Sequence, residues 1–206
     1  MRKLVASINL TLDGFMAGPR CELDWHFRHW TEDMAGITGR ELSKADTILL
    51  GRITYEGMAA YWSSAFADLS FPRGDLAIAE MMNNHTKVVF SRSLVKTGWR
   101  NARLAGKNIR REISMLKRSG AAGNKNIILF GSGTLASTLM QLGLIDEYLL
   151  WIHPVILGQG KLLFKDSISQ QLRLTASETF SSGVVLLRYE IQHQPELVFD
   201  NMPLSG

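Results

Sequence analysis

The chain has 206 residues and a formal net charge of +4, and 46% of its residues are hydrophobic. This length allows one domain with a sizeable core, and the mild positive charge suits small anionic ligands without requiring nucleic acid. The single cysteine, Cys21, excludes an internal disulfide framework. Polar residues interrupt the apolar run at the N-terminus, so this run does not have the pattern of a signal peptide or a membrane span. We therefore expect a cytoplasmic protein.

The first half of the chain predicts short strands that alternate with helices. Leu4 to Leu10 points its side chains alternately to two sides, as a strand does, and Asp13-Gly14 forms a turn after it. Further strands are expected at residues 47–50 and 86–90. Helices are expected over much of 24–45, from 54 to 61 and, as a short helix or an ordered loop, at 76–83, with loops at 15–20 and 62–74.

The second half predicts the same alternation and then a closing hairpin. Residues 108–118 form an amphipathic helix with a basic outer face, and the pattern permits a short strand within 99–104. Ser181-Ser182-Gly183 separates two strand candidates and makes them a hairpin. The other segments are strands at 126–130, 148–155, 172–180 and 184–193, a helix at 134–142, a turn at 158–160 and an aperiodic tail.

These elements predict one domain over residues 1–193 and a tail over 194–206. Strands separated by helices indicate an α/β fold with a mixed, mostly parallel sheet, helices on both faces and a C-terminal antiparallel hairpin. Tyr148–Ile156 and Val184–Leu187 are apolar on both faces, and few helices remain after residue 143 to cover them. We therefore expect a homodimer; the alternative is that the helix at 134–142 and the tail cover this surface within one chain.

The stretch from Asn126 to Gly143, NIILFGSGTLASTLMQLG, combines a strand, a glycine turn and a helix. Glycines allow the backbone to approach a phosphate closely, and the first N–H groups of the helix point toward it. The same pattern also fits a glycine turn that only starts the helix. A Rossmann-type site would need an acidic residue after the next strand, but that strand runs into His153-Pro154, so we expect any dinucleotide to be held in a different fold.

Three segments, taken together, resemble the dihydrofolate reductase-like family. They are SINLTLDGFMAG at Ser7–Gly18, ILLGRITYEGM at Ile48–Met58 and LFGSGTLASTLMQLGLIDEYLLWIHPVILGQGKLLF at Leu129–Phe164. Their order and spacing are similar to the branch that contains the C-terminal reductase domain of the riboflavin-biosynthesis deaminase-reductase. Together they cover most of residues 3–192, so the resemblance extends to the whole expected domain.

The resemblance implies an NADPH site built from three segments. One segment would meet the pyrophosphate at a helix start, a second the adenosine 2′-phosphate, and the glycine turn would cradle the central phosphates and the nicotinamide ribose. The family often has consecutive glycines joined by a cis peptide at this turn, whereas this chain has Ser132 second, which leaves the peptide geometry open. For the pyrophosphate, the implied residues are Gly51, Arg52 and Thr54. For the 2′-phosphate they are Ser91 and Arg92, and for the central phosphates and the nicotinamide ribose they are Gly131, Ser132, Gly133, Thr134 and Leu135.

Two acids are candidates for the catalytic group. The resemblance places Asp13 beside the nicotinamide, although Asp before glycine is more often only a turn former. Asp24 could hydrogen-bond a ring N–H of a heterocyclic substrate, with Trp25 as a stacking surface, or it could simply cap a helix. Glu56 could contact substrate or pair with Arg52.

Other chemistries find less support. His26 and His29 lack a recognisable zinc spacing, so we expect that both histidines are solvated and that the protein binds no metal. The basic helix at 108–118 lacks the interleaved aromatic residues of a nucleic-acid site, so we expect no nucleic-acid partner. A zinc deaminase domain needs more cysteines than one. The expected function is NADPH-dependent reduction of a small pterin- or pyrimidine-like substrate by hydride transfer, and the alternative is an NADP(H)-binding protein of the same fold without efficient catalysis.

Overall fold

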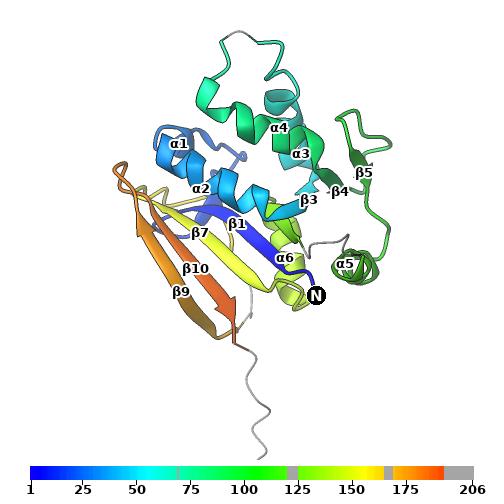
Figure 1. Ribbon diagram of the computed structural model, residues 1–206. Coiled ribbons are helices and arrows are strands. Elements are labelled where there is room, and N and C mark those ends of the chain that lie inside the picture. The colour runs from blue at the N-terminus through cyan, green and yellow to red at the C-terminus, as the bar shows by residue number, and fades with distance from the viewer. Residues whose placement is uncertain (69, 120–124, 165–168, 193–206) are drawn as a thin grey trace, which may run out of the picture.

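The computed structural model describes residues 1–68, 70–119, 125–164 and 169–192, and an eight-stranded sheet forms its centre (Figure 1). The strand order is β5-β4-β3-β6-β1-β7-β10-β9. The strands from β5 to β7 run parallel, whereas β10 and β9 form an antiparallel hairpin on β7, so the predicted fold class is confirmed. The strands are β1 (Leu4–Thr11), β3 (Ala45–Gly51), β4 (Thr86–Phe90), β5 (Ala102–Leu104), β6 (Asn126–Phe130), β7 (Glu147–His153), β9 (Leu172–Thr179) and β10 (Val185–Ile191).

Helices cover both faces of the sheet. On one face lie α1 (Asp24–Phe27), α2 (Glu32–Ser43), α3 (Arg52–Trp62), the 3-10 turn η1 (Arg73–Asp75) and α4 (Leu76–Asn84); on the other lie α5 (Ile109–Arg118) and α6 (Gly133–Gln141) (Figure 1). The helix α5 buries Ile113 and Leu116 and exposes three arginines, Arg110, Arg111 and Arg118, as its pattern predicts. The side chain of Lys117, which was expected outward too, is only 13% exposed and pairs with Asp146. In the part of the chain that the structure describes, no helix is long and apolar enough to cross a membrane.

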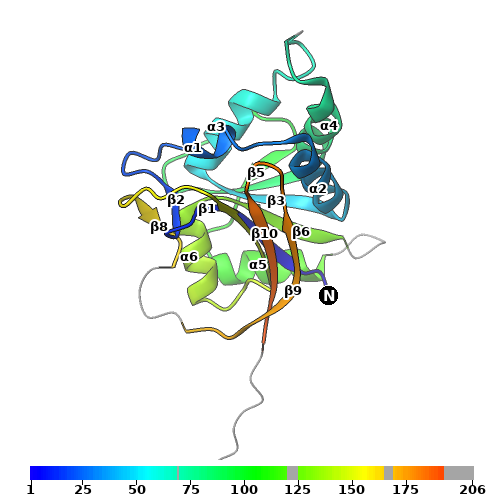
Figure 2. The same cartoon turned by 90° about the vertical axis from the view of Figure 1, so that its left-hand side faces the viewer.

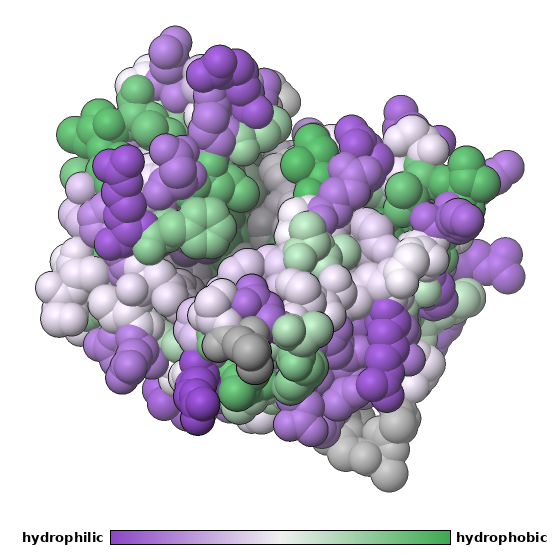
Figure 3. Space-filling view, turned by 90° about the horizontal axis from the view of Figure 1, so that it is seen from above, coloured by the Kyte–Doolittle hydropathy of each residue, from purple (hydrophilic) through white to green (hydrophobic). Residues whose placement is uncertain are grey.

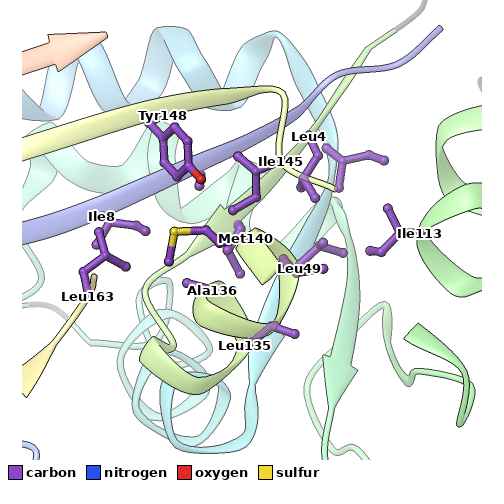
Figure 4. Close-up of a cluster of buried hydrophobic side chains, with 14 of the residues drawn as sticks. Leu4, Ile8, Leu49, Ile113, Leu135, Ala136, Met140, Ile145, Tyr148 and Leu163 are labelled. Atoms are coloured by element: carbon purple, nitrogen blue, oxygen red, sulfur yellow. The ribbon is translucent and has the colours of Figure 1, made fainter. Parts of the chain in front are cut away.

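The core on the α6 side shows why β1 is the central strand. Leu4 and Ile8 of β1 pack with Met140 of α6, Tyr148 of β7 and other buried side chains (Figure 4). The opposite side of β1 is covered as well, because Val5 lies in a cluster with residues of α2 and of the hairpin. A parallel strand between two layers of helices is buried on both faces, so its alternation does not mark a solvent side.

Two parts of the chain differ from the sequence-based expectation. The helix expected over 24–45 is two helices, because the chain leaves helical geometry between Phe27 and Glu32 and Thr31 is extended, with φ −128° and ψ 163°. The loop expected at 15–20 contains a strand, β2 (Phe15–Ala17), which pairs antiparallel with β8 (Lys161–Leu162). The predicted tail at 194–206 lies outside the described residues.

Candidate functional site

The predicted site residues cluster at the edge of the sheet where the parallel strands end. Neighbouring strands end at Gly51, Phe130, Thr11 and His153, in the spatial order β3, β6, β1 and β7. In open α/β sheets, ligands bind outside these carboxyl ends. Figure 2 shows α1, β2 and β8 gathered at the same side of the molecule. The surface seen from above is hollowed between two raised parts, with polar and apolar residues interleaved around the hollow (Figure 3).

Ser132 joins the two helix starts that the sequence predicts as phosphate sites. Its Oγ accepts a hydrogen bond from the backbone N–H of Gly51, which is the N-cap of α3, at 2.7 Å. The same Oγ lies 2.7 Å from the hydroxyl oxygen of Thr54, in the first turn of α3. Since Ser132 is itself the N-cap of α6, one side chain holds both helix starts in a fixed relation. We call this set of contacts the Ser132 clasp.

The backbone of the glycine turn is shaped to make the clasp. Ser132 adopts φ 61° and ψ 74°, a left-handed conformation that ordinary side chains rarely take, and Gly131 before it has φ +52°. A Cβ added at Gly51 would lie 2.7 Å from Ser132 Oγ, so only glycine fits there. The peptide bonds of this turn are trans, as are those of the other described residues, which answers the question left by the unusual Ser132.

The helix starts on both sides of the clasp offer backbone N–H groups. The first N–H groups of a helix have no partner within it. The N-cap of α3 is Gly51, which has no side chain, and the side chain of Ser132, the N-cap of α6, does not bond to its own first turn. Thr134 is exposed at the start of α6, but Leu135 is buried in the core, so Leu135 can offer only its backbone. Gly133 lies against Met16, whose sulfur would be 3.3 Å from an added Cβ.

The predicted arginines flank these helix starts. Arg52 forms an ion pair with Glu56 one turn along α3, at 2.9 Å, and both side chains are about half exposed. This answers one of the sequence alternatives, since Glu56 does pair with Arg52. After β4, Ser91 Oγ accepts from the N–H groups of Ser93 and Leu94, at 3.2 and 2.9 Å, and forms a turn. Arg92 is exposed in this turn and has no ion pair among the described residues.

Asp13 connects two loops at this edge. Its carboxylate accepts from Thr11 Oγ1 at 2.5 Å and, across the loop that follows β7, from the N–H groups of Leu157 and Gly158 at 3.1 and 2.8 Å. The hydrogen bond from Thr11, together with those from the two N–H groups, lowers the pKa of Asp13 below its usual range. The geometry therefore favours an ionised Asp13 carboxylate that positions the two loops. This role is close to that of a turn former, which is one of the two alternatives for Asp13 in the sequence analysis.

The other predicted acid and its aromatic neighbour lie in α1. Asp24 is exposed in the first turn, but the N-cap is Leu23 and carries no side-chain cap, so the interpretation of Asp24 as the cap is wrong. Trp25 is only 8% exposed, and its ring meets that of His153 edge to face, with centroids 5.1 Å apart. Trp25 is thus part of a buried layer and does not offer an open stacking surface.

Three histidines adjoin this layer: His26 and His29, which the sequence analysis expects to be solvated, are partly buried, and His153 is buried. His153 is fully buried, and its Nε2 lies 2.9 Å from Asn9 Oδ1 on β1. Burial, with the nearby His26 and His29, lowers the pKa of His153 to about 3, and burial also lowers the pKa of His26. Among the described residues, no three His, Cys, Asp or Glu side chains gather in a way that could hold a metal ion.

Comparison with known proteins identifies the family. A family model described as the RibD C-terminal domain matches residues 2–186. The chain belongs to the RibD C-terminal domain family. The resemblance inferred from the three sequence motifs is thereby confirmed.

Relatives of this RibD C-terminal domain span nearly its whole length. It is 35% identical over 190 residues to the uncharacterized protein YyaP of Bacillus subtilis strain 168, covering 91% of this chain and 94% of that one. A crystal structure of a putative riboflavin biosynthesis protein from Shewanella sp. PV-4 superposes with a TM-score of 0.70 at 20% identity, covering 93% of this chain and 99% of that one. A pyrimidine reductase-like protein from Corynebacterium diphtheriae gives 0.63 at 14%, covering 93% and 92%. These two structures support the fold alone.

His153 is the residue of this RibD C-terminal domain that sequence reasoning missed. It was noted only as the end of a strand. The available signal was a polar side chain directly after the apolar run from Tyr148 to Ile152, at the carboxyl end of the strand, which is the edge where ligands bind. Its partner Asn9 lies on the neighbouring strand, 144 residues away in sequence, so no local pattern connects the two.

Proposed function

We propose that this RibD C-terminal domain is an NADPH-dependent reductase of a small heterocyclic substrate. The observation that carries the proposal is the Ser132 clasp, which holds two helix starts together at the ligand-binding edge of the sheet. Two sets of backbone N–H groups at one place suit a ligand with several phosphates. The family assignment supports reductase chemistry in general terms, and the choice of NADPH and of a pterin- or pyrimidine-like substrate is part of the proposal.

The residues at the edge fit this cofactor. The first turns of α3 and α6 would hold the central phosphates through residues 52–54 and 133–135, next to Gly51 and Gly131. Arg52 can turn to a phosphate because an exposed ion pair such as that with Glu56 contributes about 0.5 kcal/mol or less. Ser91 and Arg92, beyond the end of β4, would hold the 2′-phosphate.

The cofactor supplies the hydride, and the chain supplies position and electrostatics. Asp13 would hold the two loops beside the reacting ring through its contacts with Thr11 and Gly158. Asp24, exposed at the start of α1, remains our candidate for an acid that hydrogen-bonds a substrate ring N–H. We further propose a cytosolic protein that acts as a homodimer.

A second function is favoured by one observation. Asp13 is ionised and engaged with backbone N–H groups, and Asp24 is exposed, so in the described residues neither predicted acid is enclosed near the clasp as a proton donor. A protein that binds NADP(H) without efficient turnover would have this arrangement. Steady-state oxidation of NADPH with a panel of pterins and pyrimidines separates the two functions, because the binding protein would show no substrate-dependent rate.

The test of the cofactor assignment is the variant Arg92→Ala. A charge-assisted hydrogen bond contributes about 1.5 to 3 kcal/mol, so NADPH should bind at least about tenfold more weakly, whereas NADH should bind as it does to the wild type. Arg110→Ala, which removes an exposed arginine on α5, is the matched control and should change neither affinity. Calorimetry measures both cofactors. Equal losses for NADPH and NADH would contradict the assignment of Arg92.

A further inference from the structure

Two buried polar atoms in the layer under α1 have no hydrogen-bond partner among the described residues. They are Nε1 of Trp25 and Nδ1 of His153. Trp25 is 8% exposed and His153 is 0% exposed, and their rings are in contact. Native proteins pair the large majority of buried side-chain polar atoms, and an exception is often part of a functional site. Two exceptions in one contact call for an explanation.

The two atoms have opposite hydrogen-bonding character. Asn9 Oδ1 can only accept, so Nε2 of His153 carries the proton that it donates over 2.9 Å. Because the pKa of His153 is lowered to about 3, the ring is neutral and its Nδ1 is an acceptor. The indole Nε1–H of Trp25 can only donate. One donor and one acceptor therefore lie together in a dry layer.

Ring nitrogens of neighbouring Trp and His side chains do have hydrogen-bond partners. Trp151, two residues before His153 on the same face of β7, donates its Nε1–H to Ser7 Oγ at 3.1 Å. His26 and His29 each pair Nδ1 with a backbone carbonyl, at 2.7 and 3.0 Å. The unpaired atoms of Trp25 and His153 thus stand out against three paired ring nitrogens in the same region.

The layer is placed to meet a ligand at the edge of the sheet. His153 ends β7, which is separated from β6 by β1 alone, so it lies at the same edge of the sheet as the glycine turn, two strands away. In the described structure, the hydrogen bonds of residues 24–30 stay within residues 23–30. The short helix α1 can therefore move outward as a unit without breaking a hydrogen bond to the sheet.

We propose that Trp25 and His153 form a substrate subsite for the adjacent C=O and N–H groups of a cyclic amide. The indole N–H of Trp25 donates to the ring carbonyl, and Nδ1 of His153 accepts from the ring N–H, while α1 shifts to admit the ring. This inference rests on the proposed function, because that function makes the ligand a heterocycle. Pyrimidine-dione and pterin rings carry this pair of groups, and a ring whose nitrogens are methylated does not.

The test uses uracil and 1,3-dimethyluracil with the full chain, alone and saturated with NADP⁺. Calorimetry gives the affinities, and ¹⁵N resonances of histidine side chains report whether Nδ1 of His153 accepts a hydrogen bond. Uracil should bind at least about tenfold more tightly than its dimethyl analogue, because the analogue leaves the imidazole acceptor unpaired. Uracil should also shift the Nδ1 resonance of His153.

Two matched Trp-to-Phe variants locate the effect. Trp25→Phe keeps an aromatic ring and removes the unpaired N–H, so it should weaken the binding of uracil and of dimethyluracil alike, because both carry the ring carbonyl that loses its donor. Trp151→Phe removes an N–H that is already paired with Ser7, so it should leave both affinities intact. NADP⁺ should bind both variants as it binds the wild type, and circular dichroism confirms that each is folded.

The outcomes separate the subsite from the proposed function. Equal binding of the two uracils, no binding of uracil, or an unchanged affinity for uracil in Trp25→Phe would overturn the subsite while NADP⁺ binding leaves the cofactor assignment in place. A wild type that does not bind NADP⁺ would overturn the proposed function instead. In that case the titrations without cofactor still decide the subsite through the Nδ1 resonance of His153.

Discussion

His153 links the stability of the protein to pH through a single proton. Its pKa is lowered to about 3 in the folded chain, whereas an unfolded histidine titrates near 6.5. Between these values the unfolded chain binds the proton and the folded chain does not, so stability falls as pH falls. The contribution of His153 is complete above about pH 6.5 and is lost progressively toward pH 3.

We therefore predict that His153→Gln flattens the acid side of the stability profile. Glutamine does not titrate and can still donate to Asn9. Between about pH 6.5 and 4.5, the wild type should lose free energy of unfolding more steeply than the variant, by up to about 1.4 kcal/mol per pH unit. Urea denaturation at several pH values measures both curves. The carboxylates titrate in both proteins, so their contributions cancel in the difference between the two free energies of unfolding. Parallel curves for the wild type and the variant would show that His153 ionises freely in the folded protein.

Sequence reasoning succeeded for residues whose role is local and failed for those whose partner is distant. Gly131, with φ +52°, is needed by the turn itself, so the pattern reveals it. The role of Ser132 depends on Gly51, 81 residues away, and that of His153 depends on Asn9. Asp24 was misread for another reason: the helix N-cap is Leu23, one residue earlier, and such boundaries are the least reliable part of a pattern.

At the scale of elements, the Ser132 clasp makes the starts of α3 and α6 one unit. A residue other than glycine in the left-handed region costs about 1 kcal/mol, which the structure accepts in order to place Oγ between Gly51 and Thr54. The two helix starts are therefore positioned before any ligand arrives.

We predict that two substitutions at Ser132 separate the clasp from its backbone strain. Ser132→Ala removes both hydrogen bonds and keeps the strained conformation, so it should lower the free energy of unfolding by about 1 to 3 kcal/mol. Ser132→Gly loses the same bonds but relieves the strain, and should lose about 1 kcal/mol less. Urea denaturation compares them. Equal losses would mean that the left-handed conformation costs nothing here, and no loss in either would mean that the clasp does not stabilise the fold.

Most strands and helices were predictable because their patterns are local. The strands Thr86–Phe90 and Asn126–Phe130 have the predicted bounds, since short apolar runs between breakers define them. The pairing of β2 with β8 was missed, because strands of three and two residues carry no period and are defined by each other across 144 residues of chain from Ala17 to Lys161. The break between α1 and α2 was also missed, and the two glycines of this segment, Gly36 and Gly39, do not mark it, because both lie within α2.

At the scale of the whole molecule, the hairpin of β9 and β10 forms one margin of the sheet (Figure 1). Seven of the eight residues of β9 are exposed, and Leu174 is 50% exposed opposite Tyr189 of β10. An edge strand presents unpaired backbone groups, and soluble proteins cover such edges or use them for assembly. The exposed Leu174 on this margin supports the expectation of a dimer.

We predict that the protein is a homodimer and that the hairpin lies in its interface. Sedimentation equilibrium should give twice the chain mass of 23.0 kDa at micromolar concentration. Leu174→Lys should shift the equilibrium toward monomer, because it places a charge in the interface. Leu12→Lys, at a 66% exposed leucine in the turn after β1, is the control and should leave the dimer intact. A wild type that sediments as a single species near the chain mass would show that the hairpin is covered within one chain.

The central place of β1 has a consequence for how the chain acquires its structure. Residues 4–11 are synthesised first, yet they pair on one side with 126–130 and on the other with 147–153. The first of these partners is complete only when 130 of the 206 residues have been made and the second only when 153 have, and pairings so distant in sequence slow folding. At a translation rate of about 5 to 20 residues per second, the first strand waits for many seconds with its apolar side chains unpaired. The last parallel strand to emerge is thus the one that closes the sheet around the first.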